Sequence, residues 1–228
     1  INCNSSGGGG GSPGVGDWNH LNSIYYNEIL NQIVISSRHM NEFYVIDHST
    51  NIDQAASHIG GIYGKGGDFL YRWGNPANYN RGDNSFQILN AQHAVNWIPN
   101  GYPGAGNFIL FNNNHSQNNS AVLEIVPPID ENGFYDIDSI NAYGPISFEW
   151  IFQGDFYSNT QSGAQRLYNG NTLITSAADQ QIFEVNVDGQ IEWYYQGEEH
   201  TVRALKYSDD YLGQVYIGDL NDDNIINI

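Results

Sequence analysis

Gly189-Gln190-Ile191-Glu192-Trp193 is the last of three similar stretches in this chain, each an apolar run that ends in tryptophan. The earlier copies are Phe69-Leu70-Tyr71-Arg72-Trp73 and Ile146-Ser147-Phe148-Glu149-Trp150. Two further strand-like runs, rich in β-branched and aromatic residues, precede each copy. A recurring group of three strands predicts a fold built from copies of one small sheet, with function where the copies converge.

Spacing and turn signals favour an all-β fold of the propeller type. Trp150 and Trp193 lie 43 residues apart, a normal length for one four-stranded blade. The 77 residues between Trp73 and Trp150 predict insertions, which we expect at residues 75–87 and 112–120. No window has helical periodicity, and at most a helical turn is expected at residues 27–31 or 53–58. A β-sandwich is the competing fold.

The number of copies predicts an incomplete ring. A closed propeller needs at least four blades, about the minimum seen in such folds, whereas three to four are visible here. The chain lacks an initiator methionine and opens in a glycine-rich stretch, so we expect an internal fragment. We divide it into a Gly/Ser-rich loop (1–16), propeller blades (17–211), and a linker with the start of another motif (212–228).

Composition excludes several classes of function. Seven Lys and Arg residues against 25 Asp and Glu give a formal net charge of −18, which repels nucleic acid. No apolar run approaches the length of a membrane span. The single cysteine, Cys3, allows no intrachain disulfide.

Aligning the copies on their Asn-Gly turns predicts a shared site. His93 precedes Asn100-Gly101 by seven residues, and Ser162 precedes Asn169-Gly170 by the same distance. They would therefore begin equivalent strands in successive blades.

His20 and Asn22 open the first copy by the same logic, and Arg38 follows its next strand. Imidazole can act as a nucleophile or exchange protons, while guanidinium and amide groups hold a tetrahedral anion. The alternative, that His20 and Asn22 only satisfy backbone groups at the mouth of the channel, stays open.

Several phrases resemble the bacterial, PAPS-independent aryl-sulfate sulfotransferase family. They occur in family order: Asp17-Trp18-Asn19-His20-Leu21-Asn22-Ser23-Ile24, then Ser36-Ser37-Arg38, then Gln92-His93-Ala94, followed by Asn107-Phe108-Ile109-Leu110-Phe111. The phrases at 44–48, 65–76 and 162–167 resemble a subgroup of this family. The resemblance implies a six-bladed β-propeller whose N-terminal blades, with at least one more active-site histidine, are absent here.

The resemblance also implies an activity, which is ping-pong transfer of a sulfuryl group from a phenolic sulfate ester to another phenol, without a cofactor. His93 matches the histidine that is transiently sulfated. His20, Asn22 and Arg38 match residues that bind the sulfuryl oxygens and assist proton transfer. Ser162 and Trp18 are expected on the substrate side.

A second reading belongs to another class of function. It is a secreted, non-enzymatic propeller that binds a ligand or serves as a structural surface protein. Trp18 and Trp97 illustrate the choice, because either ring could stack on an aryl group or belong to the core.

The C-terminus predicts a calcium loop. Oxygen-bearing side chains alternate as in the first nine positions of an EF-hand-type loop, giving as ligands Asp219, Asn221, Asp223, Ile225 through its carbonyl, and Asn227. The stretch resembles the start of a dockerin-type repeat and suggests a protein partner for the extension. A calcium site predicts a periplasmic or extracellular setting, and an acidic tail is the alternative.

The remaining histidines have no metal-ligand spacing between them. We expect turn or surface positions for all five: His39, His48, His58, His115 and His200.

Overall fold

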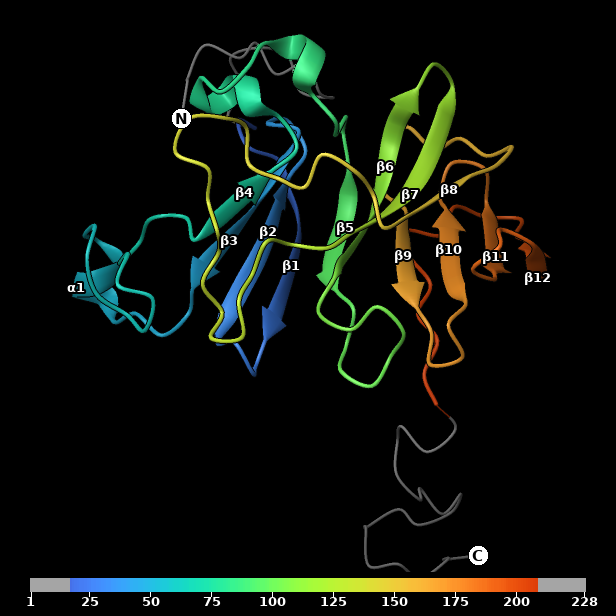
Figure 1. Ribbon diagram of the computed structural model, residues 1–228. Helices are drawn as coiled ribbons and strands as arrows, with labels where there is room; N and C mark the ends of the chain where they lie inside the picture. The colour runs from blue at the N-terminus through green and yellow to red at the C-terminus, as the bar shows by residue number, and fades with distance from the viewer. Residues whose placement is uncertain (1–16, 209–228) are drawn as a thin grey trace, which may run out of the picture.

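The computed structural model describes residues 17–208, which form twelve strands and three short helices (Figure 1). The strands are β1 Leu21–Asn27, β2 Gln32–Ser37, β3 Glu42–Asp47, β4 Tyr71–Trp73, β5 His93–Trp97, β6 Phe108–Ser116, β7 Asn119–Ile125, β8 Trp150–Gln153, β9 Gly163–Arg166, β10 Thr172–Ser176, β11 Gln181–Val185 and β12 Ile191–Gln196. The helices are α1 Ile52–Ala55 and the 3-10 turns η1 Pro76–Tyr79 and η2 Asn84–Phe86.

The strands form three antiparallel four-stranded sheets that follow one another along the chain (Figure 1). The first sheet holds β1 to β4, the second β5 to β8, and the third β9 to β12, each in sequence order. The predicted all-β class is confirmed, and so is the repeat of one small sheet. The described residues form three such sheets and do not by themselves close a ring.

The three tryptophans that reveal the repeat lie in equivalent strands. Trp73, Trp150 and Trp193 fall in β4, β8 and β12, the fourth strand of each sheet. Trp150 and Trp193 pair with Glu124 and Glu184 of the third strands. The repeated sequence motif therefore marks the last strand of each sheet.

The insertions between Trp73 and Trp150 are only partly as predicted. Residues 75–87 form the expected insertion, with η1 and η2, but residues 112–120 lie mostly in the hairpin of β6 and β7. The sequence suggests a loop there because it is rich in asparagine, whereas these side chains hydrogen-bond within the fold. The longer connection is residues 126–149, so the strand expected at 146–150 begins only at Trp150.

This long connection packs back on the first sheet. Trp73 donates its indole N–H to the carbonyl of Pro145 at 2.9 Å, and Tyr135 stacks on Tyr71 with ring centroids 4.8 Å apart. Ile146, expected in a strand, is instead fully exposed on this connection. The helical turn expected at 53–58 is confirmed by α1.

The second sheet has a core on each face. Phe108 and Leu110 of β6 point into a cluster shared with the first sheet, while Ile109 and Phe111 point into one shared with the third. This alternation follows from the two-residue period of a strand. Each buried side chain of this size stabilises the fold by about 2 kcal/mol. Trp97 also belongs to the first cluster, which makes it a core residue.

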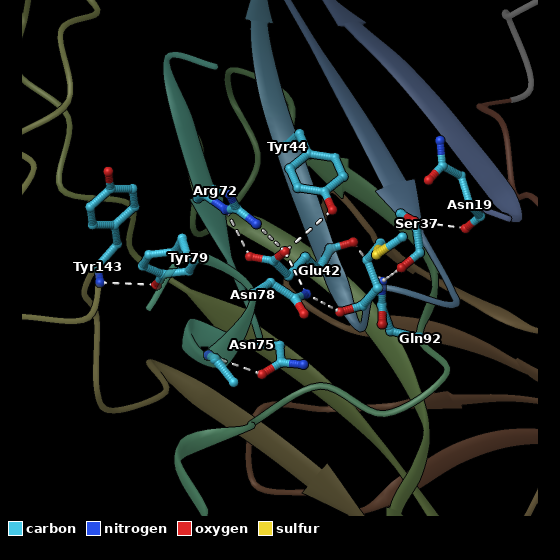
Figure 2. Close-up of polar contacts among 12 residues, drawn as sticks. Asn19, Ser37, Glu42, Tyr44, Arg72, Asn75, Asn78, Tyr79, Gln92 and Tyr143 are labelled. Carbon is cyan, nitrogen blue, oxygen red and sulfur yellow. Dashed lines mark hydrogen bonds and ion pairs between the residues drawn. The ribbon is translucent and has the colours of Figure 1, made fainter. Parts of the chain in front are cut away.

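Buried or half-buried ion pairs connect the third strands to neighbouring elements. Glu42 of β3 pairs with Arg72 of β4 and also accepts hydrogen bonds from Tyr44 and Asn78 (Figure 2). Glu124 of β7 pairs with Arg166 of β9, in the next sheet.

The trailing segment, residues 201–206, packs on the third sheet. Its position there is like that of β9, the first strand of the third sheet, on the second sheet. The carbonyl of Val202 accepts from the backbone N–H of Ser162 at 3.1 Å. Lys206 pairs with Glu184 of β11 at 2.7 Å. The described residues contain no helix long and apolar enough to cross a membrane.

Candidate functional site

The first strands of the three sheets bring the predicted residues together. His20 directly precedes β1, His93 begins β5 and Ser162 directly precedes β9. Strand β5 adjoins both β1 and β9. A Cβ atom at Gly163 would lie only 3.0 Å from the Cβ atom of Ala94, so glycine permits this close approach.

The backbone is distorted at the start of each first strand. His20, Ala94 and Ser162 have left-handed φ angles of 47°, 56° and 80°. The register shifts between Leu21 and Ser23 in β1, and between His93 and Asn96 in β5. Such bulges redirect side chains and are common beside active sites.

Gln92 fixes His93 relative to the first sheet. Its side-chain nitrogen donates to the backbone carbonyls of Ser37 and Glu42, at 3.0 and 2.8 Å (Figure 2). These two residues flank the turn 38–41, which carries Arg38. The residue that precedes His93 is thus attached to both ends of that turn.

His93 is buried, and its ring is held by two acceptors. Its Nδ1 atom lies 3.0 Å from the carbonyl oxygen of Ala91 and 2.8 Å from Oδ1 of Asn113. Because both partners accept, Nδ1 carries the proton. The Nε2 atom of the neutral ring therefore has a free lone pair.

Asn113 is the functional residue that sequence reasoning missed. Its side-chain nitrogen donates to the carbonyls of Ser158 and Gln161, at 2.8 and 3.0 Å, which turns Oδ1 toward His93. The sequence contains one relevant signal, a run of three asparagines at 112–114 that continues a strand. An amide run after an apolar strand resembles a turn, and this hid the contact.

Burial keeps His93 neutral. Desolvation lowers its pKa from 6.5 to about 4, and the nearby Arg38 and His20 add to the decrease. The hydrogen bonds from His93 to Asn113 and Ala91 act in the opposite direction. An imidazole in this state is a competent nucleophile at neutral pH.

Arg38 reaches from the first sheet toward the third. Its backbone N–H donates to the carbonyl of His20 at 3.1 Å, and its Nη2 atom lies 3.4 Å from the carbonyl of Asn159. Asn159 lies in the loop before β9. Arg38 is near enough to His93 for its positive charge to lower the pKa of that histidine.

His20 belongs to a small polar cluster. Its Nδ1 atom lies 2.5 Å from Oδ2 of Asp17, and its ring centroid lies 4.8 Å from that of His39. This hydrogen bond lowers the pKa of the Asp17 carboxyl. His39 is in the turn 38–41 as expected, but it is buried and does not lie on the surface.

Asn22, Ser162 and Trp18 fit the predicted site less well. Asn22 donates to the carbonyl of Gln92 at 2.6 Å, which is the backbone-satisfying role left open as its alternative. Ser162 donates to the carbonyl of Thr160 and accepts from the N–H of Ala177, so its hydroxyl is engaged in the fold. Trp18 is partly exposed, two residues before His20.

The predicted calcium ligands lie outside the described residues, so the calcium loop stays a prediction. These are Asp219, Asn221, Asp223, Ile225 and Asn227. The three histidines at exposed positions each have a local partner: His48 contacts Asn31, His58 contacts Asp68, and His200 contacts Gln161.

The arrangement can hold and receive an anionic group. It combines a buried imidazole with a free lone pair, a guanidinium that stabilises negative charge, and a second, partly exposed imidazole that can exchange protons. The three groups come from the starts of β1 and β5 and from the turn after β2.

Comparison with known proteins identifies one family. The sequence profile described as Arylsulfotransferase (ASST) matches residues 4–216. A search of curated protein sequences finds no match.

Among solved structures, the chain is similar to a protein of unknown function from Bacteroides caccae, at 13% identity and a TM-score of 0.44, over 83% of this chain and 50% of that chain. It is also similar to virginiamycin B lyase from Staphylococcus aureus. A catalytically inactive variant with quinupristin gives 12% identity and a TM-score of 0.35, over 82% and 58% of the two chains. The selenomethionine-substituted enzyme gives 12% and 0.30, over 80% and 71%. At these TM-scores the likeness assigns neither fold nor activity.

Proposed function

This chain belongs to the arylsulfotransferase (ASST) family, and from that premise we propose that its site transfers a sulfuryl group from a phenolic sulfate ester to a phenol. The chain spans half the length of the Bacteroides caccae structure. Because the three described sheets do not by themselves close a ring, we place the activity in a complete protein with further blades. The observation that carries the proposal is the free lone pair on Nε2 of His93. Two acceptors hold the proton on Nδ1, so Nε2 is available as a nucleophile.

In the first step, Nε2 of His93 attacks sulfur. An N–S bond forms as the bond between sulfur and the phenolic oxygen breaks, and the electron pair of that bond leaves with the phenol. Arg38 stabilises the charge on the non-bridging oxygens. His20 supplies a proton to the departing phenoxide.

The second step reverses the first with another phenol. The acceptor gives its proton to His20 and attacks the sulfur of the sulfated histidine. The N–S bond breaks, and its electron pair returns to Nε2 of His93. The enzyme ends in its starting state, which is why one histidine serves both half-reactions.

Mass spectrometry tests the covalent intermediate. The complete protein is incubated with 4-nitrophenyl sulfate, and intact-mass measurement with peptide mapping is expected to place one SO3 group on the peptide that contains His93. The His93→Ala variant should gain no mass, while His58→Ala should behave as the wild type. A folded protein that gains no mass, or gains it on another residue, overturns the mechanism.

A further inference from the structure

Two histidines and an aspartate form a group of metal-ligand type beside the sulfuryl site. One ligand atom from each of Asp17, His20 and His39 lies within 4.8 Å of the others. The two imidazole rings are 4.8 Å apart and inclined by 34°. Two imidazoles and a carboxylate are a common ligand set for zinc.

His39 contributes a lone pair that has no partner. Its Nδ1 atom lies 2.9 Å from the backbone carbonyl of Asp17, which can only accept, so Nδ1 carries the proton. Its Nε2 atom is buried and has no hydrogen-bond partner among residues 17–208. Leaving such an acceptor unpaired costs about 1–3 kcal/mol, and a bound cation would remove that cost.

Asp17 and His20 place two atoms of metal-ligand type side by side. The 2.5 Å contact joins a carboxylate oxygen to Nδ1 of His20. A metal ion can replace the proton of this contact, so that the Asp17 carboxylate oxygen and Nδ1 of His20 become ligands of one ion. Both side chains are partly exposed, at 44% and 40%, so solvent ions can reach them and the side chains can move.

We propose that Asp17, His20 and His39 bind a divalent transition-metal ion of the Zn²⁺ type. Zinc takes nitrogen and oxygen ligands at about 2.0–2.2 Å, so the exposed Asp17 and His20 draw closer to the buried His39 on binding. Imidazole favours such ions over Ca²⁺ and Mg²⁺, which prefer oxygen.

Metal binding has a consequence for the proposed activity. An imidazole whose Nδ1 atom binds a metal cannot become an imidazolium, so His20 can no longer supply the proton that the departing phenoxide takes. Zn²⁺ should therefore inhibit sulfuryl transfer. This consequence rests on the proposed function, whereas the binding site itself does not.

Titration of the 228-residue chain with Zn²⁺, followed by calorimetry, tests the site. The experiment uses a Cys3→Ser background, which removes the only thiol. We expect one Zn²⁺ ion bound, with affinity reduced about tenfold or more by His39→Gln and by Asp17→Asn. His58→Gln is the matched control, because His58 also contacts a carboxylate, that of Asp68, at 2.8 Å.

The two substitutions keep the test independent of folding. Asp17 is partly exposed, so Asp17→Asn should unfold at the same temperature as the parent even if buried His39→Gln does not. Affinity unchanged in Asp17→Asn and His39→Gln, or lowered equally in His58→Gln, overturns the site. Inhibition of the complete protein by Zn²⁺ that persists in His39→Gln overturns the link to catalysis alone.

Discussion

The Nδ1 atom of His93 lies 2.8 Å from Oδ1 of Asn113, across the pair of strands β5 and β6. Because the other end of the Asn113 amide donates to two backbone carbonyls, the oxygen cannot exchange places with the nitrogen without losing both bonds. The Asn113 amide and the Ala91 carbonyl together therefore hold the proton of His93 on Nδ1. In the proposed mechanism, activation of the nucleophile therefore depends in part on a strand residue that has no charge.

Replacing Asn113 by alanine should lower the stability and weaken the preference for Nδ1–H, because only the Ala91 carbonyl then accepts from Nδ1 of His93. We expect the free energy of unfolding to fall by about 2–4 kcal/mol, since the carbonyl of Gln161 loses its side-chain donor and the buried carbonyl of Ser158 keeps only a 3.4 Å contact with Ser120. Denaturant unfolding measures this loss, and ¹⁵N NMR of His93 reports the tautomer. The control is Asn114→Ala, whose side chain accepts from Tyr157. A population of Nδ1–H and a free energy of unfolding that both equal those of the parent would contradict the role.

The low pKa of His93 predicts a particular pH dependence. In the folded protein the pKa is lowered to about 4, mainly by desolvation, against 6.5 for an ordinary histidine. Between these values the unfolded chain binds a proton that the folded chain does not. Stability should therefore fall as pH decreases from about 6.5 to about 4, by up to about 3 kcal/mol from this group.

Two measurements check this dependence. Unfolding curves between pH 7 and 4 should show a smaller acid loss in His93→Gln, which cannot titrate there. The acid limb of kcat/KM should lie near the lowered pKa of about 4. An acid limb at the ordinary histidine value, with equal acid loss in both proteins, refutes the prediction.

Replacing Gln92 by leucine should loosen the site without touching substrate. Gln92 is fully buried, and the change leaves the carbonyls of Ser37 and Glu42 without this donor. We expect a loss of about 2–3 kcal/mol in the free energy of unfolding. Sulfate affinity should also weaken, because the turn with Arg38 is no longer tied to His93. Gln87→Leu is the control, since the side chain of Gln87 donates to the carbonyl of the nearby Leu89.

The ion pairs should differ in strength according to their burial. Arg72→Met leaves the fully buried Glu42 carboxylate without its cation and should cost about 3–5 kcal/mol. Lys206→Met should cost about 1 kcal/mol or less, because that lysine is more than half exposed. Thermal and denaturant unfolding compare the two. Equal losses in both variants would show that burial does not control the contribution.

Much of the fold could be predicted from local pattern. The tryptophan repeat and the Asn-Gly turns mark strands whose period and spacing are visible in sequence, and the fourth-strand positions of Trp73, Trp150 and Trp193 confirm this. Aligning the copies on their Asn-Gly turns places His93 and Ser162 at equivalent positions, and in the structure His93 begins β5 while Ser162 directly precedes β9. These features depend on short-range rules that each copy repeats.

The features that sequence reasoning missed are long-range. In the sequence, Asn113 looks like a loop residue. Its partners lie far from it along the chain: His93 is 20 positions earlier, and Ser158 and Gln161 are 45 and 48 positions later. His39 looks like a turn residue, and only the packing of Asp17 and His20 over the turn buries it. A polar residue in a strand has no periodic signature that distinguishes a structural contact from a solvated one.

Two ion pairs have the same orientation along the chain, Glu124–Arg166 and Glu184–Lys206. In both, the carboxylate lies on the third strand of a sheet, and the cation lies in the segment that follows that sheet along the chain. Two such faces related by a twofold axis would bring carboxylate against carboxylate, so this contact is heterologous, head to tail. In a tandem duplication of the third sheet, the carboxylate of one copy would therefore face the cation of the next. The charges on the two faces thus favour one order of sheets along the chain.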